Sequence, residues 1–161
     1  MKYFTLLYFI YLDLLLLLLF FHHNIASNAL DYFQRDLLIE MLRWFFEDRV
    51  VNYRVVINPN YSITIDRSCN GVVPLLIFWA AILAYRTKIV HKLQWMFMGY
   101  IALISANSLR IVFVIYMVLL DSKYFTLAHD YIGNGFLMLL GFGLFMLFMD
   151  HVDKKTNLSP N

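Results

Sequence analysis

The sequence has little charge and almost no cysteine. Of its 161 residues, 15% are Asp, Glu, Lys or Arg, against roughly 25% in ordinary soluble domains. The net charge of +2 leaves no basic excess for contacts with phosphates, which argues against a nucleic-acid-binding protein. One cysteine cannot close an intramolecular disulfide, so a disulfide scaffold is excluded. The chain also has no internal repeats, low-complexity runs or Gly-rich phosphate loops.

Apolar residues are correspondingly abundant. Hydrophobic side chains make up 61% of the chain and aromatic side chains 18%. Because roughly 45–50% apolar residues fill the core of a soluble domain of this length, this chain has apolar surface that it cannot hide from water. The composition therefore argues against a soluble enzyme or a disordered protein and predicts a small integral membrane protein.

Four apolar stretches can form membrane spans, at residues 3–21, 69–85, 93–120 and 129–149. A hydrocarbon core of roughly 30 Å needs about 20 helical residues, so 69–85 is short, and 93–120 must tilt, protrude or break near residues 105–108. Residues 3–21 also resemble a secretory signal, but they exceed its usual apolar length of about 7–15 residues, which favours an uncleaved anchor. We predict a single all-α membrane domain over residues 1–161, built as a four-helix transmembrane bundle.

The segment at residues 22–68 differs in texture and is predicted to be an extracytoplasmic insert. Residues 29–51 carry apolar side chains at helical spacing with charged residues between them, which predicts an amphipathic helix. Residues 53–65 alternate and are rich in β-branched and aromatic side chains, with the turn signal Asn58-Pro59-Asn60 between the halves. This pattern predicts a small β-hairpin.

The distribution of Lys and Arg predicts the orientation. Each side of the bundle carries six of these residues, and the set that lies in the shorter segments is assigned to the cytoplasm. The cytoplasmic set is Lys2, Arg86, Lys88, Lys92, Lys154 and Lys155. The opposite set is Arg35, Arg43, Arg49, Arg54, Arg67 and Lys123. The protein is thus expected to be a multi-pass protein of the cytoplasmic (inner) membrane with both termini in the cytoplasm. Cys69 and His129 then both begin spans on the outer face.

Arg110 is the first candidate for chemistry. An arginine inside a membrane helix costs roughly 2.5–3.5 kcal/mol on insertion scales, so it needs a reason to be there. Asn107 lies three residues earlier, on the same face of a helix, and can hold the guanidinium or bridge to another helix. The structural alternative is that Arg110 reaches outward to the interface or pairs with Asp13.

Cys69 and His129 join Arg110 at the outer ends of three different spans. A thiol needs a base or a cation to become a thiolate, and acyl transfer needs donors for an oxyanion, which are roles for His and Arg. Taken singly, Cys69 can be an inert buried thiol and His129 an interfacial residue. One Cys and one His are too few ligands for a metal site, so we expect no metal and no cofactor.

At these residues the chain resembles the exosortase/archaeosortase family of membrane cysteine transpeptidases. The resemblance rests on three blocks in order: Ser68-Cys69-Asn70-Gly71 opening a span, Asn107-Ser108-Leu109-Arg110-Ile111 within the next, and His129 at the start of the last. With the helices between them, these blocks cover residues 55–149. The chain looks most like the compact types designated by the letters H and F, because larger members have about twice the spans.

The resemblance implies a nucleophile at Cys69, an arginine at Arg110 that stabilises the acyl intermediate, and an acid/base at His129. Asn107, Asn70 and Gly71 would support them, the last two through backbone N–H groups. The implied partners are the lipid bilayer and exported proteins that carry a C-terminal motif, a transmembrane helix and a basic tail, a sorting signal similar to PEP-CTERM. The acceptor of the thioester can be an amine or water.

The alternative from another class is a non-enzymatic helical assembly partner or small pore, in which Arg110, Asp13 and Asn107 bind helices together. A third reading, an intramembrane protease of unrelated type, is disfavoured because the candidate site lies at the outer face.

Overall fold

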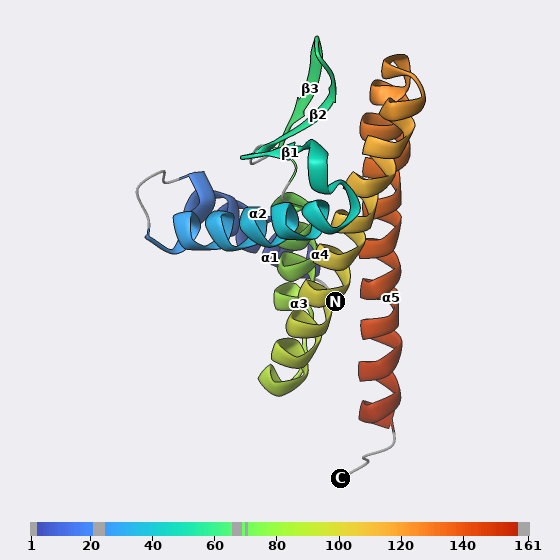
Figure 1. Ribbon diagram of the computed structural model, residues 1–161. Helices are drawn as coiled ribbons and strands as arrows, with labels where there is room; N and C mark the ends of the chain where they lie inside the picture. Colours follow the sequence, from blue (N-terminus) through green and yellow to red (C-terminus); the bar gives the residue numbers. More distant parts are fainter. Residues whose placement is uncertain (1–2, 21–24, 66–68, 70, 158–161) are drawn as a thin grey trace.

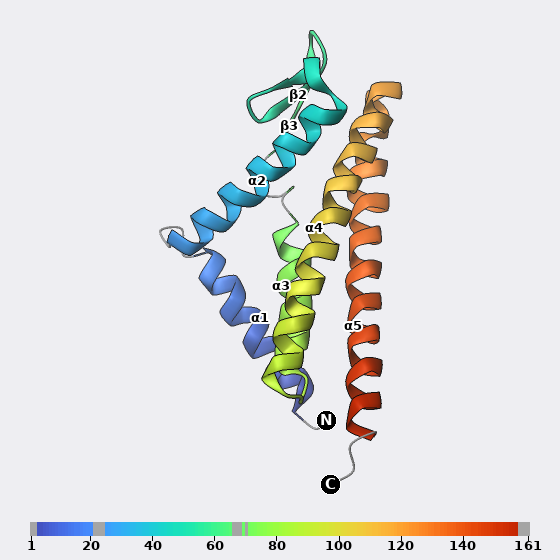
Figure 2. The ribbon, with the colours of Figure 1, turned by 60° about the horizontal axis from the view of Figure 1, so that its bottom comes forward.

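The computed structural model describes residues 3–20, 25–65, 69 and 71–157, which are mostly helical. Within these ranges five α-helices form: α1 (Phe4–Phe20), α2 (Ile25–Phe45), α3 (Val72–Ala84), α4 (Ile89–Leu120) and α5 (Asn134–Asn157). α3, α4 and α5 pack against one another, α1 packs on α3, and α2 packs on α4 (Figure 1). Figure 2 shows α1 and α2 spreading away from α3, while α4 and α5 lie side by side along most of their length.

The two ends of this helical body differ. At one end, the Tyr85 ring lies 6.4 Å from the Phe4 ring and 5.3 Å from the Phe148 ring, and the Tyr85 hydroxyl donates to Asp153 Oδ1 over 2.8 Å. The starts of α1 and α4 and the last turns of α5 meet there. Cys69 lies at the other end of α3, beside the sheet.

Three short strands form an antiparallel sheet in the order β1 (Val50–Val51), β2 (Arg54–Asn58) and β3 (Tyr61–Thr64). Val55 and Ile63 stand opposite each other and are buried, while their neighbours along the strands are exposed. Alternation of this kind places one face of the sheet on a core and the other in solvent. The buried face packs on α2 and α4, in a cluster that includes Leu42, Val55, Ile63 and Ile115.

Among the described residues, two helical segments are long and apolar enough to cross a membrane: Ile89–Leu120, with 32 residues, and Ser122–Lys155, with 34. α1 and α3 have 17 and 13 residues, fewer than the roughly 20 that a straight crossing needs. The structure thus provides two candidate spans where the sequence predicts four. Only 17% of the apolar stretch in Ser122–Lys155 is buried, so this surface needs lipid or another protein around it.

The structure refines the predicted elements in three places. The helix predicted at residues 29–51 ends at Phe45, because Val50 and Val51 pair with Val55 and Arg54 and so add a third strand to the predicted hairpin. Of the three alternatives for residues 93–120, a break near residues 105–108 does not occur: α4 is continuous there, and the Asn107 side chain bonds to the Cys69 carbonyl and to Arg110 of the same helix. The last predicted span, residues 129–149, begins inside the π-helix η4 (Leu127–Gly133) and continues into α5.

Candidate functional site

The carbonyl of Cys69 anchors the segment before α3 to α4. Cys69 is buried, with 9% of its surface exposed, and its backbone oxygen accepts a hydrogen bond of 2.8 Å from Asn107 Nδ2. Gly71 follows in the left-handed region at φ 72°, and a Cβ there would lie 2.9 Å from Asn107 Cγ. Only glycine combines this backbone conformation with so close an approach. The Cys69 segment is therefore held against α4 at Asn107.

Asn107 also holds Arg110. Its Oδ1 accepts a bond of 3.2 Å from Arg110 Nη1, so one buried amide links the Cys69 backbone to the guanidinium. Both side chains lie on the same face of α4, as their three-residue spacing requires, and 2% of Asn107 is exposed. An amide is suited to this position because it donates and accepts at once.

Arg110 connects α4 to η4. Its Nη2 donates to the backbone oxygen of His129 over 3.1 Å, and the residue is 5% exposed. The guanidinium also interacts electrostatically with Cys69 and with Asp130. Its Nε is buried and has no hydrogen-bond partner among the described residues. Asp13 is exposed on α1, so the alternative in which Arg110 reaches outward or pairs with Asp13 is wrong.

Phe125 and Asp130 hold the His129 ring in place. It stacks on the Phe125 ring at 5.0 Å with an interplanar angle of 10°, and its Nδ1 lies 2.8 Å from Asp130 Oδ1. About a fifth of the His129 side chain is exposed (21%). A carboxylate on Nδ1 favours the tautomer that leaves Nε2 as the base. A π-helical turn inside a longer helix is common at functional sites.

The loop before this turn is fixed by Asp121. Its side chain accepts from the Lys123 backbone N–H over 3.0 Å and pairs with Lys123 Nζ over 2.8 Å. The bonds to Lys123 hold the pKa of Asp121 below its ordinary value. A lowered carboxyl pKa stabilises the loop at pH values above the ordinary pKa, and the contribution is lost as the pH falls through the lowered one.

Gly133 makes room for Arg110. A Cβ at this position would lie 2.5 Å from Arg110 Nε and 2.9 Å from the Ala128 carbonyl oxygen, and real Cβ contacts are not that short. We expect Gly133→Ala to displace the guanidinium and to destabilise the fold by about 1–3 kcal/mol. Thermal unfolding of the purified protein in detergent measures this effect.

Gly135→Ala is the matched control, because nothing lies within 4 Å of a Cβ there. Alanine is favoured over glycine inside a helix by up to about 1 kcal/mol, so this variant should be as stable as the wild type or more so. Equal stability of the two variants would contradict the close packing of Arg110 on η4.

An apolar cavity of about 660 Å³ leads away from Arg110 between α1, α3 and α5. Its polar lining is confined to a few groups, among them Arg110 and Asn134, while its walls are apolar and aromatic side chains: Phe4, Tyr8, Val73, Pro74, Ile77, Phe78, Ala81, Leu137, Met138, Phe142 and Phe145. The cavity can therefore take an apolar segment whose polar end meets Arg110.

The structure brings Cys69, Asn107, Arg110 and His129 into one hydrogen-bonded chain, and Gly71 lies against it. Asn70, the remaining predicted supporting residue, lies outside the described residues. No group of three or more His, Cys, Asp or Glu side chains able to hold a metal ion occurs within the described ranges.

Sequence reasoning missed Asp130, Phe125 and Gly133. The first is adjacent to His129, and the other two lie four residues before and after it. This spacing was a usable signal, since residues four apart share a helix face.

Comparisons of the chain with protein-family models, with curated proteins and with solved structures gave no match. The resemblance to exosortases and archaeosortases therefore rests on the residues of the three sequence blocks.

Proposed function

We propose that the protein is a membrane-embedded cysteine peptidase or transpeptidase that cleaves C-terminal sorting signals of exported proteins through a thioester on Cys69. The observation that carries the proposal is the buried chain of hydrogen bonds from the Cys69 carbonyl through Asn107 and Arg110 to the His129 carbonyl. Among the described residues the hydrogen-bond partners of Arg110 are an amide and a carbonyl oxygen, so its burial is costly, and sites where charge develops during a reaction repay that cost.

The reaction begins with the thiol. His129 takes the proton from Cys69 Sγ, and the thiolate attacks a backbone carbonyl carbon of the substrate, whose oxygen becomes an oxyanion. Two of the five guanidinium N–H groups of Arg110 donate to Asn107 and His129, and the proposal assigns one of the remaining N–H groups to that oxyanion.

The tetrahedral intermediate then collapses. The C–N bond breaks, the leaving amine takes the proton from His129, and an acyl thioester remains on Cys69. Water or an amine attacks the thioester and transfers a proton to His129. The C–S bond then breaks, and the Cys69 thiolate takes that proton back from His129, which regenerates the enzyme. The first acceptor gives proteolysis and the second transpeptidation.

Substrate placement follows from the apolar cavity beside Arg110. Apolar side chains that follow a cleavage motif can enter this cavity, with the polar start of the segment near Arg110. Arg86, Lys88, Lys92, Lys154 and Lys155 lie at the end of the helical body opposite Cys69, and the bias of basic residues toward the cytoplasm favours a site on the outer face. The proposed enzyme is a multi-pass protein of the inner membrane with cytoplasmic termini.

The direct test compares the C-terminal peptides of exported proteins, by mass spectrometry, in cells that express the wild type or Cys69→Ala at equal level. We expect a set of proteins to lose an apolar C-terminal segment only with the wild type. Identical C termini in the two strains would contradict the proposal.

Asp130 is proposed as a positioning residue for His129. Asp130→Asn should lower the processing rate by about tenfold, a modest effect because the Asp130 side chain is half exposed (52%) and water partly replaces it. The reactivity of the Cys69 thiol near neutral pH should fall in parallel, which a purely structural role would not produce. Asp150→Asn, whose carboxylate pairs with Lys154, is the control and should leave both readouts unchanged.

A second candidate function is a non-enzymatic assembly protein. The exposed apolar surface of the segment Ser122–Lys155 favours it, because a partner helix can cover that surface as well as lipid can. In that case Cys69→Ser is silent, and substitution of Arg110 lowers the amount of protein rather than an activity.

A further inference from the structure

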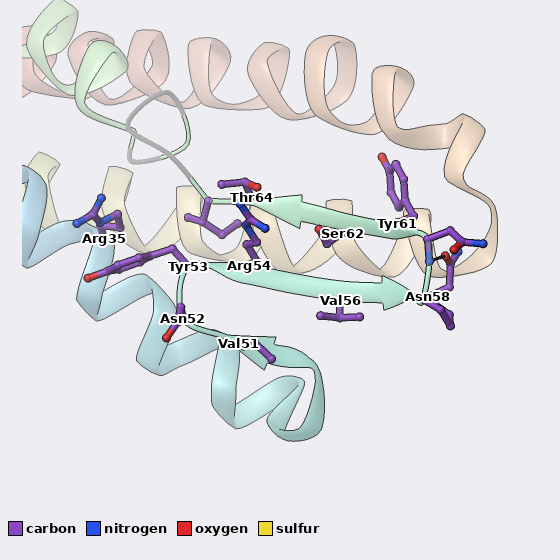
Figure 3. Close-up of a pocket in the computed structure, with 13 residues that line it drawn as sticks. Arg35, Val51, Asn52, Tyr53, Arg54, Val56, Asn58, Tyr61, Ser62 and Thr64 are labelled. Carbon is purple, nitrogen blue, oxygen red and sulfur yellow. Dashed lines mark hydrogen bonds between the residues drawn. The ribbon is translucent and has the colours of Figure 1, made fainter.

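A second cavity, of about 800 Å³, lies over the solvent-exposed face of the sheet (Figure 3). It shares no lining residue with the apolar cavity at Arg110. Residues from the three strands and their turns line it, together with Arg35 of α2. Its polar groups include amides and hydroxyls that can bond to a peptide backbone: Asn52, Asn58, Asn60, Ser62 and Thr64. A surface of this composition suits a polar ligand.

The charged side chains described in the lining of this cavity are all basic. Arg35 and Arg54 line it, and among the residues that the structure describes no Asp or Glu does. The Arg35 guanidinium lies over the Tyr53 ring at 4.0 Å, which fixes its position. Asp36 accepts a hydrogen bond of 3.1 Å from the Tyr53 hydroxyl and lines a different, smaller cavity. The two arginines therefore favour a ligand with a carboxylate or another anionic group.

β3, one of the strands that line this cavity, is an edge strand of the sheet. β3 pairs with β2 on one side, and no described strand pairs with its other side. By contrast, the part of β2 that extends past β1 has one of its backbone acceptors occupied, since Arg49 Nη1 donates to the Ile57 carbonyl over 2.9 Å. An open strand edge binds extended polypeptide through backbone hydrogen bonds.

β3 also leads directly to the candidate nucleophile. Thr64, the last residue of β3, precedes Cys69 by five positions, and five extended residues span at most about 18 Å. A chain bound along β3 is thus delivered to the outer end of α3, where Cys69 lies.

We propose that β3 and the arginine-lined cavity bind an extended, acidic segment of the substrate next to the bond that is cleaved. This inference rests on the proposed function for the identity of the ligand as substrate. The binding itself needs only the edge of β3, Arg35 and Arg54.

The test uses synthetic peptides and the full chain in nanodiscs of zwitterionic lipid. A fluorescent decapeptide of alternating Thr and Glu is the probe, its counterpart with Lys in place of Glu tests charge, and a version with alternate backbone amides N-methylated tests strand pairing. We expect the acidic peptide to bind in fluorescence anisotropy, the Lys peptide not to bind, and the N-methylated peptide to bind about tenfold more weakly or not at all. Equal binding of the plain and N-methylated peptides would overturn the pairing.

Arg54→Gln should weaken binding of the acidic peptide by about tenfold. Arg86→Gln, at the opposite end of the molecule, is the matched control and should bind normally. If Arg54→Gln binds the peptide normally, or if the wild type binds vesicles of anionic lipid through Arg54 and not the peptide, the proposal is wrong.

The outcome separates the two proposals. Cys69→Ala should bind the acidic peptide as well as the wild type does. Absence of peptide binding alongside Cys69-dependent processing would overturn only the sheet site, whereas peptide binding without Cys69-dependent processing would overturn the proposed function.

Discussion

Cells that express Cys69→Ala or Cys69→Ser should process exported proteins at least about a thousandfold more slowly than cells with the wild type. The proposed thioester forms on Sγ, and a serine hydroxyl at the same place is a far weaker nucleophile that His129 is not arranged to activate. The measurement is the fraction of substrate shortened at its C terminus over time, with the amount of the membrane protein followed in parallel.

Serine nearly preserves the volume of cysteine, so Cys69→Ser should reach normal levels in the membrane. Ser105→Ala, an exposed position on α4, is the control and should process normally. Normal processing by Cys69→Ser would exclude a covalent role for this residue and would favour the assembly protein.

Substitution of Arg110 by lysine should lower the processing rate by about 10²–10³, although the positive charge is kept. Lysine is a single point charge on a flexible stem and cannot reproduce the planar fork that reaches Asn107 Oδ1 and the His129 carbonyl together. Loss of one of these bonds leaves a buried acceptor unsatisfied, which destabilises the fold by about 1–3 kcal/mol. The initial rate and the thermal stability are therefore measured on the same preparation.

The comparison with Asn107→Ala separates catalysis from packing. Both variants break the same hydrogen bond, but Asn107→Ala retains the guanidinium. If the guanidinium stabilises an oxyanion, Arg110→Lys should lose more rate than Asn107→Ala at equal loss of stability. Equal rates at equal stability would assign Arg110 to packing alone, and Arg86→Lys serves as the surface control.

Sequence reasoning found the helices because their signal is local. Long apolar runs predict helices directly, and the alternation at residues 53–65 predicts β2 and β3. It did not find β1, because only the pairing with β2 makes Val50 and Val51 a strand. The helix α3 is shorter than the span predicted at residues 69–85, since it begins only at Val72, and the Cys69 carbonyl before it is bonded to Asn107.

The sequence likewise predicts only part of the candidate site. The order of the spans places Cys69, Arg110 and His129 at one end, and the rarity of each group in an apolar chain marks them. Their connection through Asn107 depends on which atoms face one another, as does the space that Gly133 leaves for Arg110. A single sequence does not contain that information.

The most direct test of the central proposal is the reactivity of Cys69 toward a membrane-impermeant thiol reagent across pH, in the wild type and in His129→Ala. We predict labelling from outside the cell that is fast near neutral pH in the wild type and much slower in His129→Ala. Labelling only from the cytoplasm, or the reactivity of an ordinary thiol that is indifferent to His129, would contradict an activated nucleophile on the outer face.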